Sequence, residues 1–133
     1  MAVVSTESVP ITSEPDVVTV RRRVREVSAQ LGLSLVDQTK IITAASELAR
    51  NTIIYGGGGT MQVQTLNGPR VGLRLTFEDH GPGIPDIDLA LRDGFTTGSG
   101  LGLGLGGSKR LVNEFEIFSR LGEGTRITIT RWK

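Results

Sequence analysis

The sequence contains no cysteine, which excludes disulfide bridges and any site that needs a thiolate. No apolar run approaches the roughly 18 residues that a membrane-spanning helix needs, and no basic and apolar leader segment opens the chain. The formal net charge is only +1, which argues against a general nucleic-acid-binding protein. We therefore expect a cytoplasmic protein that binds neither membrane nor nucleic acid.

What is present is the composition of an ordinary globular domain. Hydrophobic residues make up 38% of the 133 positions and charged residues 22%. A chain of this length can bury one core but not two, so we expect a single domain over residues 1–133. Composition leaves the oligomeric state open.

Two amphipathic helices are predicted in the first half of the chain. The first follows Ser13, which forms a capping box with Asp16, and ends at Gly32. The second is predicted to begin with Asp37 as its cap and to end near Tyr55. Four arginines within residues 21–25 form either a solvated helix face or a docking face for an acidic partner. Apolar residues at three- and four-residue steps form the buried faces: Val17, Val20, Val24, Val27 and Leu31, then Ile41, Ala45, Leu48 and Thr52.

Strands are predicted mainly in the second half. Residues 61–66 and 70–79 form a hairpin, and residues 115–120 and 125–132 form a second pair of strands. A short helix is expected within residues 86–92. Pro10 confines any strand near the start of the chain to a sheet edge. Helices that interrupt a mixed but mostly antiparallel sheet predict an α+β fold, a two-layer sandwich.

Residues 94–107 are unusually rich in glycine, with seven glycines in fourteen positions. So many glycines disfavour helix and strand, so a loop is predicted here, followed by a helix over residues 108–115. Backbone N–H groups at such a junction favour anions, especially phosphates. Residues 102–107 fit the spacing of a dinucleotide fingerprint, but no strand precedes them, and Lys109 follows Ser108 where a Walker A loop has the lysine first. A flexible linker would leave its leucines in water, so a lid over phosphates explains the segment better.

Glu47 and Asn51 lie four residues apart on the second predicted helix and therefore share a face. An asparagine oxygen can complete the oxygen shell of Mg²⁺, and a nearby carboxylate can orient or deprotonate an attacking hydroxyl. The alternative is a simple surface pair. Arg50 is one residue out of phase and is expected to face another way.

Asp79 ends a predicted apolar strand and precedes a turn with two glycines. The carboxylate is either a turn former or an acceptor for an amino group on a flat ligand that approaches the glycine backbone. His80 has no second histidine and no cysteine with which to form a metal site, so we expect it to face solvent.

These segments together resemble the GHKL ATP-binding fold shared by histidine kinases, gyrase-type ATPases and the anti-sigma-factor serine kinases. Residues 47–51 match its N box, residues 79–84 its G1 box and residues 100–104 its G2 box. Within that family the chain is most similar to the switch kinases of the bacterial stressosome, on residues 46–51, 78–87 and 93–97.

The resemblance implies a role for each matching residue. Glu47 would be the general base for the substrate hydroxyl, Asn51 the Mg²⁺ ligand, and Asp79 the acceptor of the adenine amino group. The positions assigned to the nucleotide pocket are Gly81, Gly83, Ile84 and Thr125, and those assigned to the lid are Thr96, Thr97, Gly100, Leu101, Gly102, Leu103 and Gly104.

The implied function is that of a serine/threonine protein kinase that uses ATP and Mg²⁺. Such a kinase phosphorylates STAS-domain antagonist and scaffold proteins and, once released, activates a PP2C-type phosphatase. An alternative that uses the same boxes is a nucleotide-gated anti-sigma factor that sequesters a sigma factor. A third is a domain that has kept the fold and lost nucleotide binding.

Overall fold

The computed structural model describes residues 2–91 and 104–133. One five-stranded sheet is formed by β1 (Ala2–Ile11), β2 (Gly59–Asn67), β3 (Gly72–Asp79), β4 (Glu114–Arg120) and β5 (Gly124–Trp132). The strands lie in the order β1-β2-β3-β5-β4, and every pairing in the described residues is antiparallel. The helices are α1 (Glu14–Gln30), α2 (Leu35–Ile54), α3 (Ile87–Ala90) and α4 (Gly104–Arg110).

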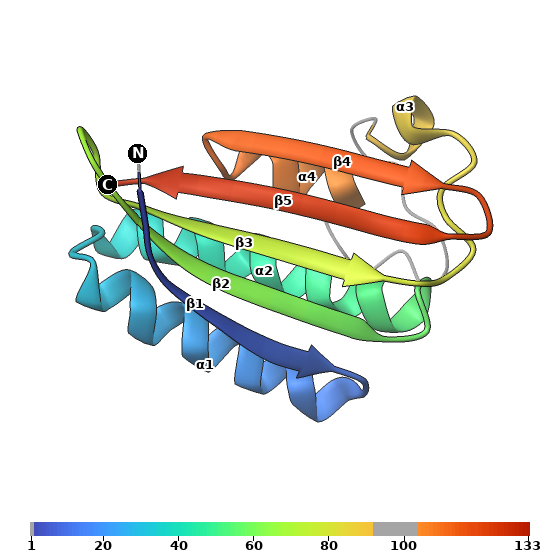
Figure 1. Cartoon of the computed structure of the whole chain (residues 1–133), viewed down its shortest axis with the longest axis horizontal. Coiled ribbons are helices and arrows are strands. Elements are labelled where there is room, and N and C mark those ends of the chain that lie inside the picture. The colour runs from blue at the N-terminus through green and yellow to red at the C-terminus, as the bar shows by residue number, and fades with distance from the viewer. Residues whose placement is uncertain (1, 92–103) are drawn as a thin grey trace.

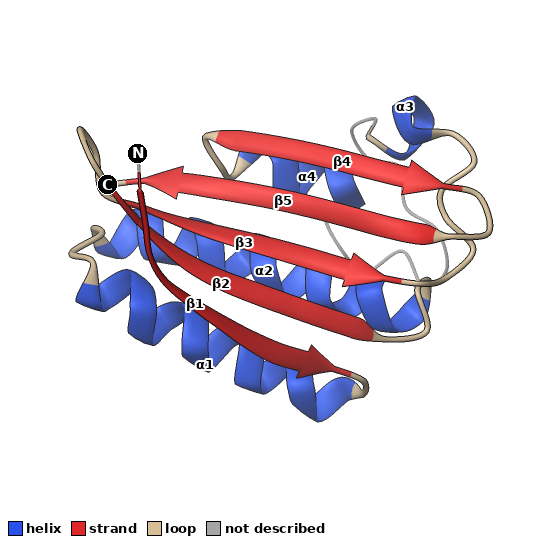
Figure 2. Cartoon of the chain, viewed as in Figure 1, coloured by secondary structure: helices blue, strands red, loops and turns tan. Residues whose placement is uncertain are grey.

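The sheet and the helices form two layers. Helices α1, α2 and α4 lie behind the sheet in Figure 1, and Figure 2 shows that no helix covers the face turned toward the reader. The predicted α+β sandwich is confirmed, and its sheet is wholly antiparallel within the described residues rather than mixed. None of the described helices is long and apolar enough to cross a bilayer.

The N-terminal strand β1 occupies an edge of the sheet, as Pro10 requires. It pairs with β2 from Ala2 opposite Asn67 to Ile11 opposite Gly59, with a shift in register between Val3 and Ser5. Proline is tolerated here because an edge strand needs only half of its backbone groups for the ladder. The sheet thus joins the start of the chain to a strand more than fifty residues later.

Helix α1 begins as predicted. The Asp16 carboxylate Oδ2 accepts hydrogen bonds from Thr12 N at 2.8 Å, Thr12 Oγ1 at 2.9 Å and Ser13 N at 3.2 Å. These bonds, those from Thr12 foremost, lower the pKa of Asp16. Among the four arginines of α1, Arg23 donates to Glu7 Oε1 of β1 at 2.7 Å.

The start of helix α2 differs from the prediction. Its cap is Ser34, whose Oγ accepts from Asp37 N at 3.1 Å, so Asp37 lies in the first turn instead of capping it. The Asp37 carboxylate instead accepts a hydrogen bond from Arg131 Nη2 at 2.6 Å. Serine and aspartate are both preferred at the N-cap, so the sequence alone does not distinguish Ser34 from Asp37. The partner of Asp37 is on the last strand, and local sequence patterns cannot identify it.

The core fills the space between the helices and the inner face of the sheet. Leu48, on the predicted buried face of α2, is 1% exposed, and Ile41 and Ala45 are fully buried. Burying one branched aliphatic side chain stabilises the fold by about 1.5–3 kcal/mol. The other layer contributes Met61, Val63, Leu73, Leu75, Phe77, Ile127 and Ile129, and α1 contributes its four predicted valines.

Helix α4 differs most from the sequence prediction. The helix predicted over residues 108–115 instead covers Gly104–Arg110, and Phe115 lies in β4. Glycines 104, 106 and 107, assigned to a loop, are therefore helical. Leu105, Gly106 and Gly107 are buried where α4 packs against α2, so tertiary packing outweighs the poor helix propensity of glycine.

The other boundaries shift less. Strand β3 begins at Gly72, two residues later than predicted. Helix α3 lies within residues 86–92 and is capped by Asp86, whose Oδ1 accepts from Leu89 N at 3.0 Å.

Candidate functional site

The fold brings the end of strand β3 beside the end of helix α2. Asp79 is the last residue of β3 and pairs in register with Gly59 on one side and Thr125 on the other. Since Phe77 is buried and Glu78 is exposed, alternation along the strand turns Asp79 toward the helical layer. The carboxylate therefore lies on the same side of the sheet as α2.

Two contacts fix the Asp79 side chain. Its Oδ1 accepts a hydrogen bond from Gly81 N at 2.9 Å. Gly56, just past the end of α2, lies so close that a Cβ built on it would be 2.4 Å from Asp79 Cγ. The second oxygen, Oδ2, has no hydrogen-bond partner among residues 2–91 and 104–133. Asp79 thus presents one oriented acceptor in a place where glycine leaves room.

The turn after Asp79 is attached to the β4–β5 hairpin. Gly122 N donates to Pro82 O at 2.9 Å, and Ile84 N donates to Ser119 Oγ at 2.8 Å. Gly83 has φ +81°, and a Cβ on it would be 2.6 Å from Arg120 O. Only glycine fits both the conformation and the space, so the turn carrying Gly81, Gly83 and Ile84 is positioned by the hairpin.

Ser119 is a site residue that the sequence predictions missed. Its Oγ also lies 2.9 Å from Thr125 Oγ1 and 3.3 Å from Gly124 O. A signal existed: Phe115 and Ile117 face the core from alternate positions of β4, and Ser119 continues that face as a hydroxyl. A polar side chain at an inward position near a strand end marks a place where polar groups converge.

Glu47 and Asn51 lie on α2, and helical spacing puts them on one face as predicted. The Glu47 side chain is only 14% exposed, and its Oε1 accepts from Arg50 Nη1 at 3.0 Å. Arg50 therefore folds back toward Glu47 instead of facing away, which corrects the expectation. Its guanidinium also lies 3.7 Å from Glu14 Oε1. Asn51 lies in the last turn of α2 and is partly buried, and its backbone oxygen accepts from Gly56 N at 3.3 Å.

The predicted lid lies mostly outside the described residues, including Thr96, Thr97, Gly100, Leu101, Gly102 and Leu103. Gly104 is the first residue of α4, which packs against α2, the helix that carries Glu47 and Asn51. The structure therefore places the C-terminal end of the proposed lid next to the helix with the candidate catalytic residues.

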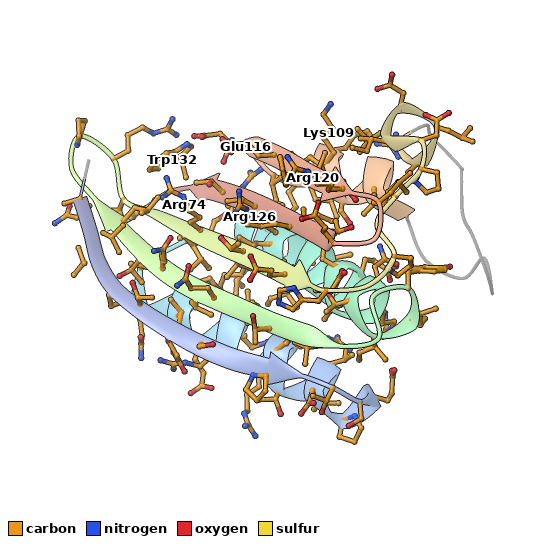
Figure 3. All side chains as sticks on the ribbon, turned by 45° about the vertical axis from the view of Figure 1, so that its right-hand side comes forward. Arg74, Lys109, Glu116, Arg120, Arg126 and Trp132 are labelled. Atoms are coloured by element: carbon orange, nitrogen blue, oxygen red, sulfur yellow. The ribbon has the colours of Figure 1, made fainter. Side chains whose placement is uncertain are left out.

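A hollow lies at the ends of β3, β4 and β5, lined in part by exposed side chains of β4 and β5. Phe118, 53% exposed, has the guanidinium carbons of Arg120 and Arg126 each 5.6 Å from its ring centroid. Figure 3 shows these two arginines on β4 and β5. The hollow is also lined by His80, which is exposed as predicted. Its lining also includes Asp79, Gly124 and Thr125, so it adjoins the site around Asp79.

The described residues hold no cluster of three or more histidine, cysteine, aspartate or glutamate side chains able to bind a metal ion. The oxygen donors near one another on α2 are the Glu47 carboxylate and the Asn51 amide. Such a set cannot enclose a cation alone, but it suits Mg²⁺, which keeps several waters and is commonly shared with substrate phosphates.

The fold thus sets Asp79, at the end of β3, beside the end of the helix that carries Glu47 and Asn51. A sequence model of the histidine kinase-, DNA gyrase B- and HSP90-like ATPases matches residues 36–133, and the chain belongs to this family.

Individual relatives give the class of enzyme. The chain is 47% identical to the serine/threonine-protein kinase RsbT of Bacillus subtilis (strain 168), over 93% of this chain and 94% of that one. It is 32% identical to an anti-sigma F factor of Thermoanaerobacter sp. (strain X514), over 84% and 82% of the two chains. The expected class, serine/threonine protein kinase, is confirmed.

Solved structures confirm the fold. A structure of the RsbU and RsbW domains of a Mycobacterium tuberculosis protein aligns with a TM-score of 0.67 at 23% identity, covering 96% of this chain and 32% of that one. The mycobacterial sensor histidine kinase MprB aligns with a TM-score of 0.57 at 20% identity, covering 96% and 97%. The chain spans about a third of the first structure, so that likeness concerns one domain of it.

Proposed function

We propose that this kinase transfers the γ-phosphoryl group of ATP to STAS-domain antagonist and scaffold proteins in a bacterial stress-response pathway. On release from them it activates a PP2C-type phosphatase. The observation that carries the proposal is the fixed Asp79 carboxylate, held by Gly81 and set against Gly56. It offers one oriented acceptor to a flat base at the end of the helix that bears Glu47 and Asn51.

Asp79 would bind the adenine amino group through its free oxygen, Oδ2. The base would lie against the turn formed by Gly81, Gly83 and Ile84, with Thr125 on the neighbouring strand. Because Asp79 Oδ1 is already occupied by Gly81 N, the carboxylate cannot rotate without losing a hydrogen bond. The site is therefore arranged before the nucleotide arrives, which lowers the cost of binding.

Glu47 would act on the substrate hydroxyl. Arg50 holds one of its oxygens at 3.0 Å, which leaves the other to accept the proton from an incoming serine or threonine. The Asn51 amide oxygen would hold Mg²⁺, which, when bound, offsets the charge of the phosphates. Residues 96–104 would supply backbone N–H groups to the same phosphates.

The proposal is tested with radiolabelled ATP and purified STAS-domain proteins from the same genome. We expect wild-type protein to label a STAS protein and Glu47→Gln to lose at least about 100-fold in transfer, since a positioned base contributes that much or more. ATP affinity, measured by calorimetry, should change less than about twofold. Glu26→Gln, which removes an exposed carboxylate from α1, should transfer normally.

Full transfer by Glu47→Gln would reject the role of this residue. Absence of any labelled STAS protein with the wild type would reject the substrate class. The relatives named anti-sigma F factor make sequestration of a sigma factor the alternative. Co-elution with a purified sigma factor that requires ATP, without transfer to STAS proteins, would favour it. We place the protein in the cytoplasm, where ATP is available.

A further inference from the structure

We propose that Ser119 is a positioning residue for the nucleotide site, and that its hydroxyl determines which hydrogen-bonding group Thr125 presents to the base. The inference rests on the proposed nucleotide site. Ser119 lies near the end of β4, partly buried, and its Oγ contacts three groups that belong to two different segments. One is the turn after Asp79, and the other is the start of β5.

A serine hydroxyl has one proton to donate and two lone pairs. Ile84 N donates at 2.8 Å and uses one lone pair. The proton can then go to Gly124 O, at 3.3 Å, or to Thr125 Oγ1, at 2.9 Å, but not to both fully. The 2.9 Å contact can form with either hydroxyl as donor, and donation by Ser119 to Thr125 gives up only the contact to Gly124 O, which is longer than the usual O–H···O range.

The choice decides the chemistry of Thr125. If Ser119 donates to Gly124 O, the Thr125 hydroxyl donates to Ser119, and only lone pairs face the site. If Ser119 donates to Thr125, the threonine keeps its own proton for a ligand. A ligand that accepts a hydrogen bond at Thr125 therefore requires Ser119 to donate to Thr125, and Ser119 can do so at the cost of the long contact to Gly124 O.

A donor at Thr125 complements the acceptor at Asp79, which is its register partner on the adjacent strand. A 6-aminopurine offers an amino donor beside a ring-nitrogen acceptor, so it matches an acceptor next to a donor. A 6-oxopurine offers the reverse pattern and would set its carbonyl against the Asp79 carboxylate. Ser119 thus contributes to selection of ATP over inosine triphosphate.

Removal of the hydroxyl should leave the fold intact. The turn remains attached by the bond from Gly122 N to Pro82 O and by the packing of Gly83 on Arg120. Ser119→Ala therefore removes one hydrogen-bond partner of Ile84 N and the donor to Thr125, while the backbone attachment persists. The Ser119→Ala variant therefore tests the effect of the hydroxyl on nucleotide binding without a large change in the stability of the fold.

The experiment measures binding of ATP and of inosine triphosphate to the full chain by calorimetry. The variants are Ser119→Ala, Thr125→Val and the double variant, with Ser8→Ala, an exposed serine of β1, as the control. We expect Ser119→Ala to weaken ATP binding about three- to tenfold, the equivalent of one hydrogen bond, and to lower the ATP preference. In the Thr125→Val background the same change should cost less than about twofold, because Ser119 acts through Thr125.

Ser119→Thr, which retains the hydroxyl, should restore ATP affinity and preference. Should Ser119→Ala unfold, Ser119→Cys keeps the shape and supplies only a weak donor, so it should show the same loss. Wild-type affinity and preference in the alanine or cysteine variant, or equal losses in both Thr125 backgrounds, would overturn the inference. Wild-type protein that binds no ATP would instead overturn the nucleotide site itself.

Discussion

Two glycines let the backbone come close to the Asp79 carboxylate in this site. Gly56 has no side chain where Asp79 needs space, and Gly81 supplies the N–H that orients the same carboxylate. Sequence patterns identified Asp79 as a candidate acceptor but assigned no role in the site to Gly56. Its role depends on a strand more than twenty residues away, so no local pattern could show it.

Gly56→Ala should therefore damage nucleotide binding more than folding. The new methyl group would lie 2.4 Å from Asp79 Cγ, so the carboxylate must move. We expect ATP affinity to fall by tenfold or more, measured by calorimetry. Gly57→Ala is the matched control: Gly57 has open space around it but φ +75°, so alanine there should lower the melting temperature and leave ATP affinity unchanged. Equal ATP affinities for Gly56→Ala and wild type would contradict the assignment.

Elements are joined mainly by contacts between distant segments. The Asp37–Arg131 pair, at 2.6 Å, ties the first turn of α2 to the last strand, and Arg131 Nη1 also donates to Leu111 O at 3.4 Å. The hydrogen bond from Arg131 is the main cause that lowers the pKa of Asp37. A helix start and a C-terminal strand are thus held together by a charge whose state depends on pH.

The sign of that dependence follows from the lowered pKa. A carboxyl whose pKa is lower in the folded state adds stability above its ordinary pKa of 3.8, and this contribution is lost as the pH falls through the folded value. Asp37→Asn should therefore reduce the melting temperature at pH 7, and the difference from wild type should shrink below about pH 4. Asp88→Asn, on the exposed side of α3, should show no such difference.

Thermal melts between pH 3 and pH 7 measure both variants. The pKa of Asp16 is also lowered in the folded state. The Asp37→Asn variant should therefore still lose some stability at acid pH, when Asp16 becomes protonated. A constant gap between wild type and Asp37→Asn at every pH would mean that packing, and not charge, accounts for the contact.

At the scale of the whole molecule, we expect ligand binding to be coupled to folding, because the proposed site is assembled from α2, β3, β4 and β5. A ligand that binds only the folded state stabilises it, by about 2.7 kcal/mol at a free concentration one hundred times Kd. We expect ATP with Mg²⁺ to raise the melting temperature of the wild type by several degrees. Asp79→Asn should fold but lose most of this increase, since the amide replaces the acceptor charge. An equal ATP-dependent increase in Asp79→Asn would contradict the role of Asp79.

Local patterns were sufficient for most of the described elements, while the roles of the candidate residues come from the resemblance to the GHKL family and stay predictions. The valine face of α1, the hairpin of β2 and β3, and the positions of Glu47, Asn51 and Asp79 follow from periodicity and spacing within short segments. These features depend on neighbours in the chain, which is why the sequence determined them.

The tertiary structure decided everything that needs two distant segments. It placed β1 beside β2, set the bounds of α4 at Gly104–Arg110 and joined Ser119 to Ile84. Glycines 104, 106 and 107 read as a loop because glycine weakens isolated helices, yet packing against α2 makes them helical. The physical reason is common to these three cases: burial and hydrogen bonds between remote residues outweigh local preference.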